Sequence, residues 1–104
     1  MFSDALIKVM GRVDLSSAEA AAAMDDIVDG RVEAAQVAGL LVGLAMKGER
    51  PDEIVGFATA MRDRAIAVPV PPGTTIDLCG TGGDNSGSFN ISSAAAIVAA
   101  ACGA

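Results

Sequence analysis

The stretch "TTIDLCGTGGDNSGSFNISSAAAIVAAACG", residues 74–103, contains the change of pattern that decides the fold class. Its first six residues are rich in β-formers and are bounded by glycines, which predicts a short buried strand over residues 74–79. Residues 91–103 are rich in alanine and predict a helix that is opened by the hydroxyls of Ser92 and Ser93 and closed at Gly103. The stretch therefore predicts a strand, a glycine-rich loop and a helix in succession.

The loop between that strand and that helix has the composition of an anion site. Where a glycine-rich turn leads into a helix N-terminus, backbone N–H groups converge on a negative charge. Glycine lacks a Cβ, so a ligand can approach the backbone directly, and neutral hydroxyls add further donors. A flexible linker is the alternative, but a linker is not expected between a buried strand and an alanine-rich helix. The residues concerned are Gly80, Thr81, Gly82, Gly83, Ser86, Gly87, Ser88, Asn90, Ser92 and Ser93.

Two common phosphate motifs are excluded by the same loop. It lacks the Lys-Ser/Thr ending of a P-loop, and it lacks the three-glycine spacing of the dinucleotide fingerprint. Asp84 is the one charged residue of the loop. A carboxylate repels phosphate at close range, so Asp84 is expected to hold the turn or to face a metal or a ligand hydroxyl.

Upstream, residues 1–68 predict a domain of short helices. Ser16 and Glu19 have the spacing of a capping box, which predicts a helix start. Residues 33–46 are apolar nearly all round, with Gly39 and Gly43 one turn apart, which predicts close packing either within the chain or against a second subunit. The stop of this helix is predicted at Lys47 and Gly48.

A further helix is predicted from Pro51 to about Ala67, because proline suits the first turn of a helix. Its inward face is predicted to carry Ile54, Val55, Ala58 and Met61.

A proline-rich segment, "VPVPPG" at residues 68–73, separates the two patterns. Proline fixes the backbone and removes hydrogen-bond donors, so this segment predicts a stiff connector. The predicted organisation is a helical domain over residues 1–68, a connector over 69–73, and the start of a second domain over 74–104.

Composition argues against several classes of protein. The net charge of −6 lacks the basic character of nucleic-acid binders, so no nucleic-acid partner is expected. The longest apolar runs fall short of the ~20 residues that a membrane span needs, and no signal peptide is recognisable, which favours a cytoplasmic protein without a membrane partner. Cys79 and Cys102 lack disulfide or zinc spacing and are predicted to be buried free thiols.

The motifs "GTGGD" at residues 80–84 and "SFNISSAAA" at residues 88–96 resemble the signature of the anthranilate phosphoribosyltransferase family of tryptophan biosynthesis. The helical block is similar to that family as well, notably in "DLSSAEAAAAMDDIVDG", "AAQVAGLL" and "KGERPDEIVGFATAMRDRA". The resemblance covers essentially the whole chain. It implies a mostly α segment: an N-terminal helical domain followed by the first strand, loop and helix of an α/β phosphoribosyltransferase domain.

The activity that the resemblance implies is a pentosyl transfer. Such a glycosyltransferase joins the anomeric carbon of 5-phosphoribosyl 1-pyrophosphate to the amino group of anthranilate and releases pyrophosphate with the help of Mg²⁺. The family's chains are considerably longer, so the present segment is expected to be an N-terminal piece that is catalytically incomplete alone. The family's N-terminal helices form a homodimer contact, and the helix over residues 33–46 fits that use.

Site residues follow from the resemblance position by position. Substrate binding is implied for Gly80, Gly82, Gly83, Asp84, Ser88, Asn90, Ser92 and Ser93, and no residue is assigned a catalytic role. Gly80 lies near both substrates, and Ser92 also ligates one Mg²⁺ in this scheme. Threonine is frequent in the family at the positions of Ser88 and Ser93; serine keeps the hydroxyl, so anion binding is expected to persist.

Three alternatives stay open. The segment could be a helical dimerisation module without catalysis. It could be a relative of the pyrimidine nucleoside phosphorylases, although their loop carries a lysine and a serine where this chain has Asp77, Leu78 and Cys79. A non-catalytic relative that binds nucleic acid is disfavoured by the negative net charge.

Overall fold

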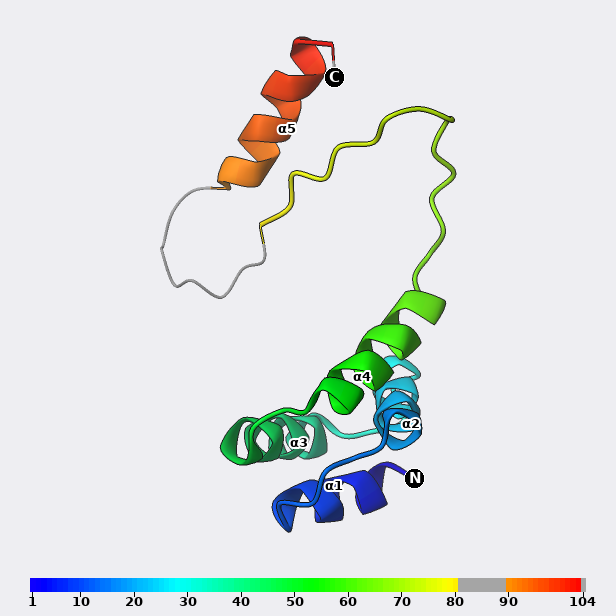
Figure 1. The fold of residues 1–104 in the computed structure, drawn as a ribbon, viewed down its shortest axis with the longest axis vertical. Coiled ribbons are helices and arrows are strands. Elements are labelled where there is room, and N and C mark those ends of the chain that lie inside the picture. The colour runs from blue at the N-terminus through cyan, green and yellow to red at the C-terminus, as the bar shows by residue number, and fades with distance from the viewer. Residues whose placement is uncertain (81–89, 104) are drawn as a thin grey trace. The chain divides into compact units, whose positions relative to one another are not determined.

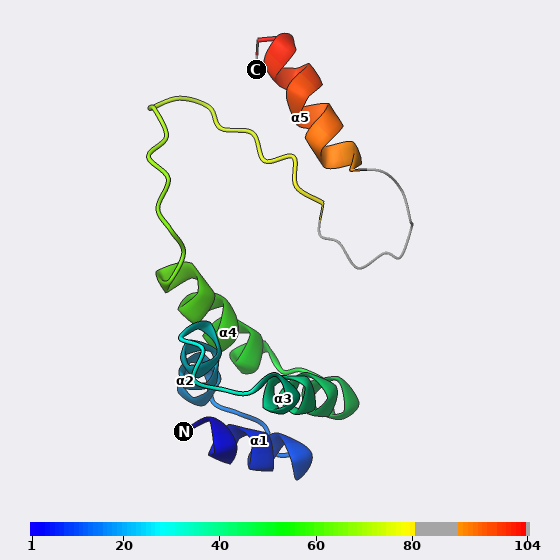
Figure 2. The ribbon, with the colours of Figure 1, turned by 180° about the vertical axis from the view of Figure 1, so that it is seen from behind.

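A computed structural model describes residues 1–80 and 90–103 of the chain, which divides into two compact units, Met1–Val68 and Pro69–Ala104. Figures 1 and 2 show the four helices of the first unit from opposite sides. The helices of the first unit are α1 Phe2–Met10, α2 Ser17–Val28, α3 Ala34–Lys47 and α4 Pro51–Asp63; the second unit contains α5 Ile91–Ala101. Among these described residues no helix combines the length and apolar character needed to cross a membrane.

The helix starts and stops of the first unit follow local chemistry. The predicted capping box is confirmed: the Ser16 Oγ accepts from the Glu19 N–H at 3.3 Å, and the Glu19 carboxylate accepts from the Ser16 N–H at 3.0 Å. Gly48 ends α3 with a φ of 86°, a left-handed conformation that favours glycine. Pro51 occupies the first turn of α4, as predicted.

The core of the first unit lies between the helix pairs α1–α3 and α2–α4, which make the most extensive contacts. It is formed by Phe2, Ala5, Val9, Leu15, Ala20, Ala23, Leu40 and Leu44. Half-buried Leu6, Ile27, Val32 and Phe57 pack against this cluster. The small residues let the helix backbones approach closely. Close contact between helices therefore contributes to the packing of the core as much as the large side chains do.

Two glycines mark the closest approaches. A Cβ on Gly43 would lie 2.7 Å from Val9 Cγ1, which places Gly43 of α3 directly against α1. A Cβ on Gly56 would lie 2.2 Å from the Ser17 carbonyl oxygen, which places α4 against the first turn of α2. The close approach predicted around Gly43 is therefore present within the chain.

The inward face predicted for α4 is wrong. Ile54, Val55 and Met61 are 56–57% exposed, and Ala58 is exposed too. The side that faces α2 instead carries the smallest residues and one carboxylate: Glu53, Gly56 and Ala60. Because α2 presents alanines at this contact, a glycine face allows closer backbone approach than a row of branched side chains.

The end of α4 also differs from the prediction, because the helix stops at Asp63 and not near Ala67. Arg64 is its C-cap, and the Arg64 guanidinium pairs with both carboxylate oxygens of Asp29 and, at 3.1 Å, with Asp25. These contacts tie the C-terminal end of α4 to that of α2.

Glu53 is the one fully buried charged residue among the described residues. Its carboxylate accepts from the N–H groups of Leu15 and Arg50, both at 2.8 Å, and from Lys47 Nζ at 3.0 Å. Lys47 Nζ also donates to Asp14 Oδ1 and to the Gly48 carbonyl, so all three ammonium protons have acceptors. Burial raises the pKa of the Glu53 carboxyl, but these donors outweigh burial, and the net pKa is lowered.

The strand predicted over residues 74–79 is not formed: this segment is irregular, and Ile76 and Leu78 are 54% and 37% exposed. A strand exists only as part of a ladder, and the described residues offer no second strand to pair with. The prediction of buried thiols is wrong for a related reason, since Cys79 and Cys102 are free but exposed. Neither is covered by packing among the described residues.

Candidate functional site

The candidate anion site is described on both sides of the loop, by the segment before Gly80 and by the beginning of α5. The two sides line a common open hollow of about 310 Å³. Its lining residues are Ile76, Asp77, Leu78, Cys79, Ser92, Ser93 and Ala96. The hollow thus places two hydroxyls and one carboxylate beside the N-terminal end of a helix.

Asn90 positions the start of α5. Its side-chain Oδ1 accepts from the Ser93 N–H at 2.9 Å, which satisfies one of the amides left without a partner at a helix start. The helix therefore begins at Ile91 with Asn90 as its cap, and the prediction that Ser92 and Ser93 open it is wrong. Both serines lie instead inside the first turn, where the helix dipole favours negative charge.

Gly80 and Ser92 are brought together across the loop. The Gly80 N–H donates to Ser92 Oγ at 3.2 Å. A Cβ placed on Gly80 would lie 3.6 Å from the same oxygen, which is ordinary van der Waals contact. Gly80, the first loop glycine, is thus joined to the hydroxyl that the resemblance assigns to the metal.

Asp77 is a charged residue of the hollow for which the sequence analysis predicted no role. The Asp77 Oδ1 accepts from the Cys79 N–H at 2.9 Å, and this hydrogen bond lowers the pKa of the Asp77 carboxyl. The signal in the sequence was an aspartate two residues before a loop, where its side chain can bond to its own backbone. An ionised Asp77 repels a phosphate, so a bound diphosphate requires compensating positive charge.

The predicted site residues divide into two groups. Gly80, Asn90, Ser92 and Ser93 are described, and the structure brings them together around the start of α5. The other four lie outside the described residues and stay predictions: Gly82, Gly83, Asp84 and Ser88.

The described residues offer few donors for a Mg²⁺ ion. Within residues 1–80 and 90–103 there is no cluster of three or more carboxylate, thiol or imidazole side chains that could hold a metal alone. The Ser92 Oγ is a hard oxygen donor of the type that Mg²⁺ prefers, and Mg²⁺ commonly keeps several waters and binds substrate phosphates. The residues present therefore fit a magnesium ion shared between the protein and a phosphorylated ligand.

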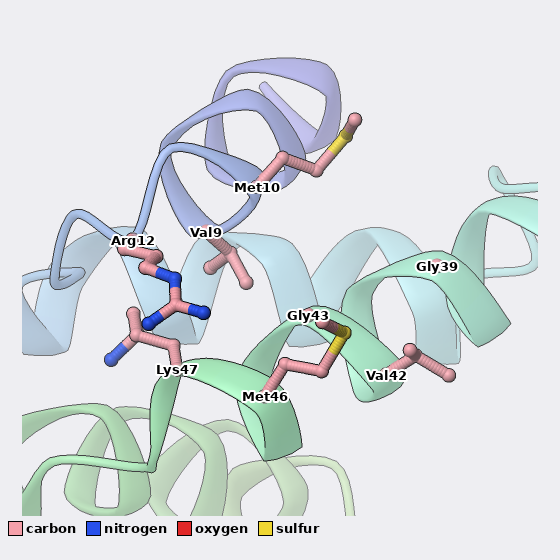
Figure 3. Close-up of a pocket in the computed structure, with 8 residues that line it drawn as sticks. All are labelled: Val9, Met10, Arg12, Gly39, Val42, Gly43, Met46 and Lys47. Atoms are coloured by element: carbon pink, nitrogen blue, oxygen red, sulfur yellow. The ribbon is translucent and has the colours of Figure 1, made fainter.

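A second concavity lies in the first unit, in a groove of about 300 Å³ between α1 and α3 (Figure 3). Arg12 and Lys47 lie together at one end of it, and Gly39 and Val42 at the other. The complete lining is Val9, Met10, Arg12, Gly39, Val42, Gly43, Met46 and Lys47. Met10, Val42 and Met46 are 71%, 58% and 69% exposed, so this groove is an apolar surface without cover from the described residues.

The helical bundle and the segment that follows it each match a known family profile. Residues 3–65 match the family profile described as "Glycosyl transferase family, helical bundle domain", and residues 72–104 match "Glycosyl transferase family, a/b domain". The chain belongs to this glycosyl transferase family.

The relatives make the similarity more specific. A protein of Thioalkalivibrio sulfidiphilus named anthranilate phosphoribosyltransferase is 54% identical over 99 residues, which is 95% of this chain and 29% of that protein. Proteins of the same name from Herpetosiphon aurantiacus and a Thermoanaerobacter species are 50% and 45% identical over 97% and 99% of this chain. The chain spans about 30% of the length of these relatives.

Proposed function

We propose that this chain is the N-terminal part of an anthranilate phosphoribosyltransferase of tryptophan biosynthesis. The observation that carries the proposal is 45–54% identity, over nearly the whole chain, to proteins of that name. It is supported by the structure around Ser92, where a hydroxyl, a capped helix start and a carboxylate share one hollow.

The reaction transfers a pentosyl group. The bond between C1 of 5-phosphoribosyl 1-pyrophosphate and the pyrophosphate oxygen breaks, a bond forms between C1 and the amino nitrogen of anthranilate, and that nitrogen loses a proton. Negative charge develops on the leaving pyrophosphate. Groups that stabilise this charge in the transition state therefore accelerate the reaction.

In this scheme the first turn of α5 receives the pyrophosphate. Asn90 fixes the start of the helix, and the hydroxyls of Ser92 and Ser93 face the hollow that would hold the anion. Magnesium held partly by Ser92 would supply the positive charge that this acidic chain lacks there, and would offset Asp77. Gly82, Gly83, Asp84 and Ser88 are proposed to contact the substrates as the resemblance implies.

The helix alone is too weak for this task. A helix N-terminus stabilises an adjacent negative charge by about 1 kcal/mol, far less than a diphosphate ligand requires. We therefore propose that the segment is inactive by itself. It acts together with residues that correspond to the remaining two thirds of its relatives.

The test uses a completed chain, in which residues 1–104 replace the matching N-terminal part of the Thioalkalivibrio sulfidiphilus relative. We expect anthranilate consumption and pyrophosphate release that depend on 5-phosphoribosyl 1-pyrophosphate and Mg²⁺. Ser92→Ala is expected to lower kcat/KM about tenfold or more, because it removes a metal ligand. Ser92→Cys should regain activity with Mn²⁺ relative to Mg²⁺, since a sulfur ligand prefers the softer ion.

An inactive completed chain, in a protein that folds, would contradict the proposal. Full turnover by Ser92→Ala would contradict only the role given to Ser92 and would leave the proposed activity standing. Phosphorolysis of a pyrimidine nucleoside by the same protein would favour the nucleoside phosphorylase alternative.

Association through the N-terminal helices is proposed as well. The groove between α1 and α3 exposes Met10, Val42 and Met46 on one apolar surface, and a second copy of the chain would cover it. Val42→Lys should dissociate a dimer in analytical ultracentrifugation. Val55→Lys, at a valine of nearly equal exposure on α4, is the matched control and should leave the mass unchanged.

The same measurement separates two functions. A dimer whose completed chain lacks transferase activity would favour the helical dimerisation module. A monomeric parent chain would contradict the association proposal.

We also propose a cytoplasmic location, which the free thiols of Cys79 and Cys102 support.

A further inference from the structure

The main-chain amides at the start of the loop, those of Cys79 and Gly80, are already engaged by side chains of the site. The Cys79 N–H donates to Asp77 Oδ1 at 2.9 Å, and the Gly80 N–H donates to Ser92 Oγ at 3.2 Å. In a glycine-rich anion loop the simple expectation is that such N–H groups point at the ligand. At Cys79 and Gly80 these N–H groups donate to side-chain oxygens of the protein instead.

We propose that Gly80 is a positioning residue whose N–H group fixes the orientation of the Ser92 hydroxyl for magnesium and diphosphate binding. This inference rests on the proposed role of Ser92. It assigns to the Gly80 amide a task different from direct contact with the anion.

The hydrogen-bonding capacity of a hydroxyl explains why this contact would favour binding of magnesium and diphosphate. An oxygen of this type accepts two hydrogen bonds or metal contacts and donates one proton. When the Gly80 N–H occupies one acceptor direction, one lone pair is left for a cation and one proton for a phosphate oxygen. All three directions are then used, and the side chain is held in one rotamer before the ligand arrives.

The small size of glycine is not what Ser92 requires at position 80. A Cβ on Gly80 would be in ordinary contact with Ser92 Oγ at 3.6 Å and would not push it away. The N–H group is therefore the feature of residue 80 that Ser92 depends on. Loss of one such hydrogen bond corresponds to a change in binding of about three- to tenfold.

The first experiment measures the bond in the chain itself. Amide hydrogen exchange of Gly80 is followed by NMR in the parent chain, in Ser92→Ala and in Ser92→Thr. We expect exchange to be several-fold faster in Ser92→Ala and to return toward the parent rate in Ser92→Thr, which keeps a hydroxyl. Equal rates in the parent and Ser92→Ala would overturn the inference without touching the proposed function.

The second experiment measures the consequence in the completed chain. Gly80→Pro removes the N–H and should raise the Mg²⁺ concentration for half-maximal rate about three- to tenfold. Gly80→Ala keeps the N–H and should keep that concentration within about twofold, whatever its effect on the rate. In a Ser92→Ala background, Gly80→Pro should cause no further change in the magnesium response, since a residue that acts through another has no effect when the other is absent.

An equal shift of the magnesium response by Gly80→Pro with and without Ser92 would overturn the positioning role, because it would indicate general distortion by proline. A completed chain without any activity would overturn the proposed function, and the magnesium role of Gly80 with it. The two failures are thus distinguishable.

Discussion

The two units of the chain contrast in what they bury. In the first unit Val9, Ala20 and Leu40 are at most 1% exposed. In the second unit α5 has no buried residue, and Ile97 and Val98 are 71% and 61% exposed. An apolar sequence is therefore not enough to form a core; what counts is whether neighbouring elements are present to cover it. The first unit is a scaffold with its own core, whereas the candidate site belongs to the unit with little internal burial.

Glu53→Ala gives the largest expected effect on this contrast. It leaves the buried Lys47 ammonium without one acceptor and removes the acceptor from the Leu15 and Arg50 N–H groups. Breaking a buried pair of this kind costs about 3–5 kcal/mol, so urea unfolding of the helical unit should shift strongly or the unit should not fold. Asp52→Ala, at the exposed neighbouring position, should change the free energy of unfolding by less than about 0.5 kcal/mol. Equal effects of the two variants would show that the Glu53 contacts do not hold the scaffold together.

Gly56→Ala should have the next largest effect. The added Cβ would lie 2.2 Å from the Ser17 carbonyl oxygen, so α4 must move away from α2, at a cost of about 1–3 kcal/mol. Gly39→Ala is the control, because its Cβ meets only Leu6 Cδ1, at 3.6 Å. Alanine is the better helix former, so the control should be neutral or stabilising in thermal unfolding. A destabilised control and a neutral Gly56→Ala would contradict the packing described for α2 and α4.

Asn90→Ala tests the second unit by itself. Loss of the bond to the Ser93 N–H should weaken α5 by about 0.5–2 kcal/mol, visible as loss of helical chemical shifts in its first turn. The unfolding midpoint of the first unit should not change, because its core contains no residue of α5. A shift of that midpoint would show that the two units are energetically coupled.

The smallest expected effect concerns pH. Hydrogen bonds from Lys8 and from the Ser16 backbone lower the pKa of Glu19 from 4.5 to about 2. Because the folded value lies below the unfolded one, this contribution to stability is complete above about pH 4.5 and is lost as the pH falls toward 2. In urea unfolding, the difference in the free energy of unfolding between the parent chain and Glu19→Gln should therefore become smaller as the pH falls from about 4.5 toward 2. A gap that stays constant from pH 7 to 2.5 would contradict the assignment.

Local signals in the sequence predicted the local structure well. The Ser16–Glu19 capping box, the stop at Gly48 and the start at Pro51 were all confirmed, because each depends on chemistry within a few residues. The family resemblance likewise gave a helical domain followed by the start of an α/β domain, and the family profiles agree.

Features that depend on partners were not predictable in the same way. Periodicity placed Ile54 and Val55 inward, but the alanine surface of α2 selected the face with Gly56. The strand over residues 74–79 and the burial of Cys79 needed covering elements that the described residues do not supply. In the site, the hydrogen bond from the Gly80 N–H to Ser92 Oγ joins residues twelve positions apart, and no local pattern predicts it.

The most direct test of the division between scaffold and site is amide hydrogen exchange in the completed chain, with and without 5-phosphoribosyl 1-pyrophosphate and Mg²⁺. This division predicts that the ligands slow exchange at Gly80 and in the first turn of α5, around Ser92 and Ser93, while exchange in α2 and α4 is unchanged. Protection that appears in the helical unit and not at the start of α5 would contradict it.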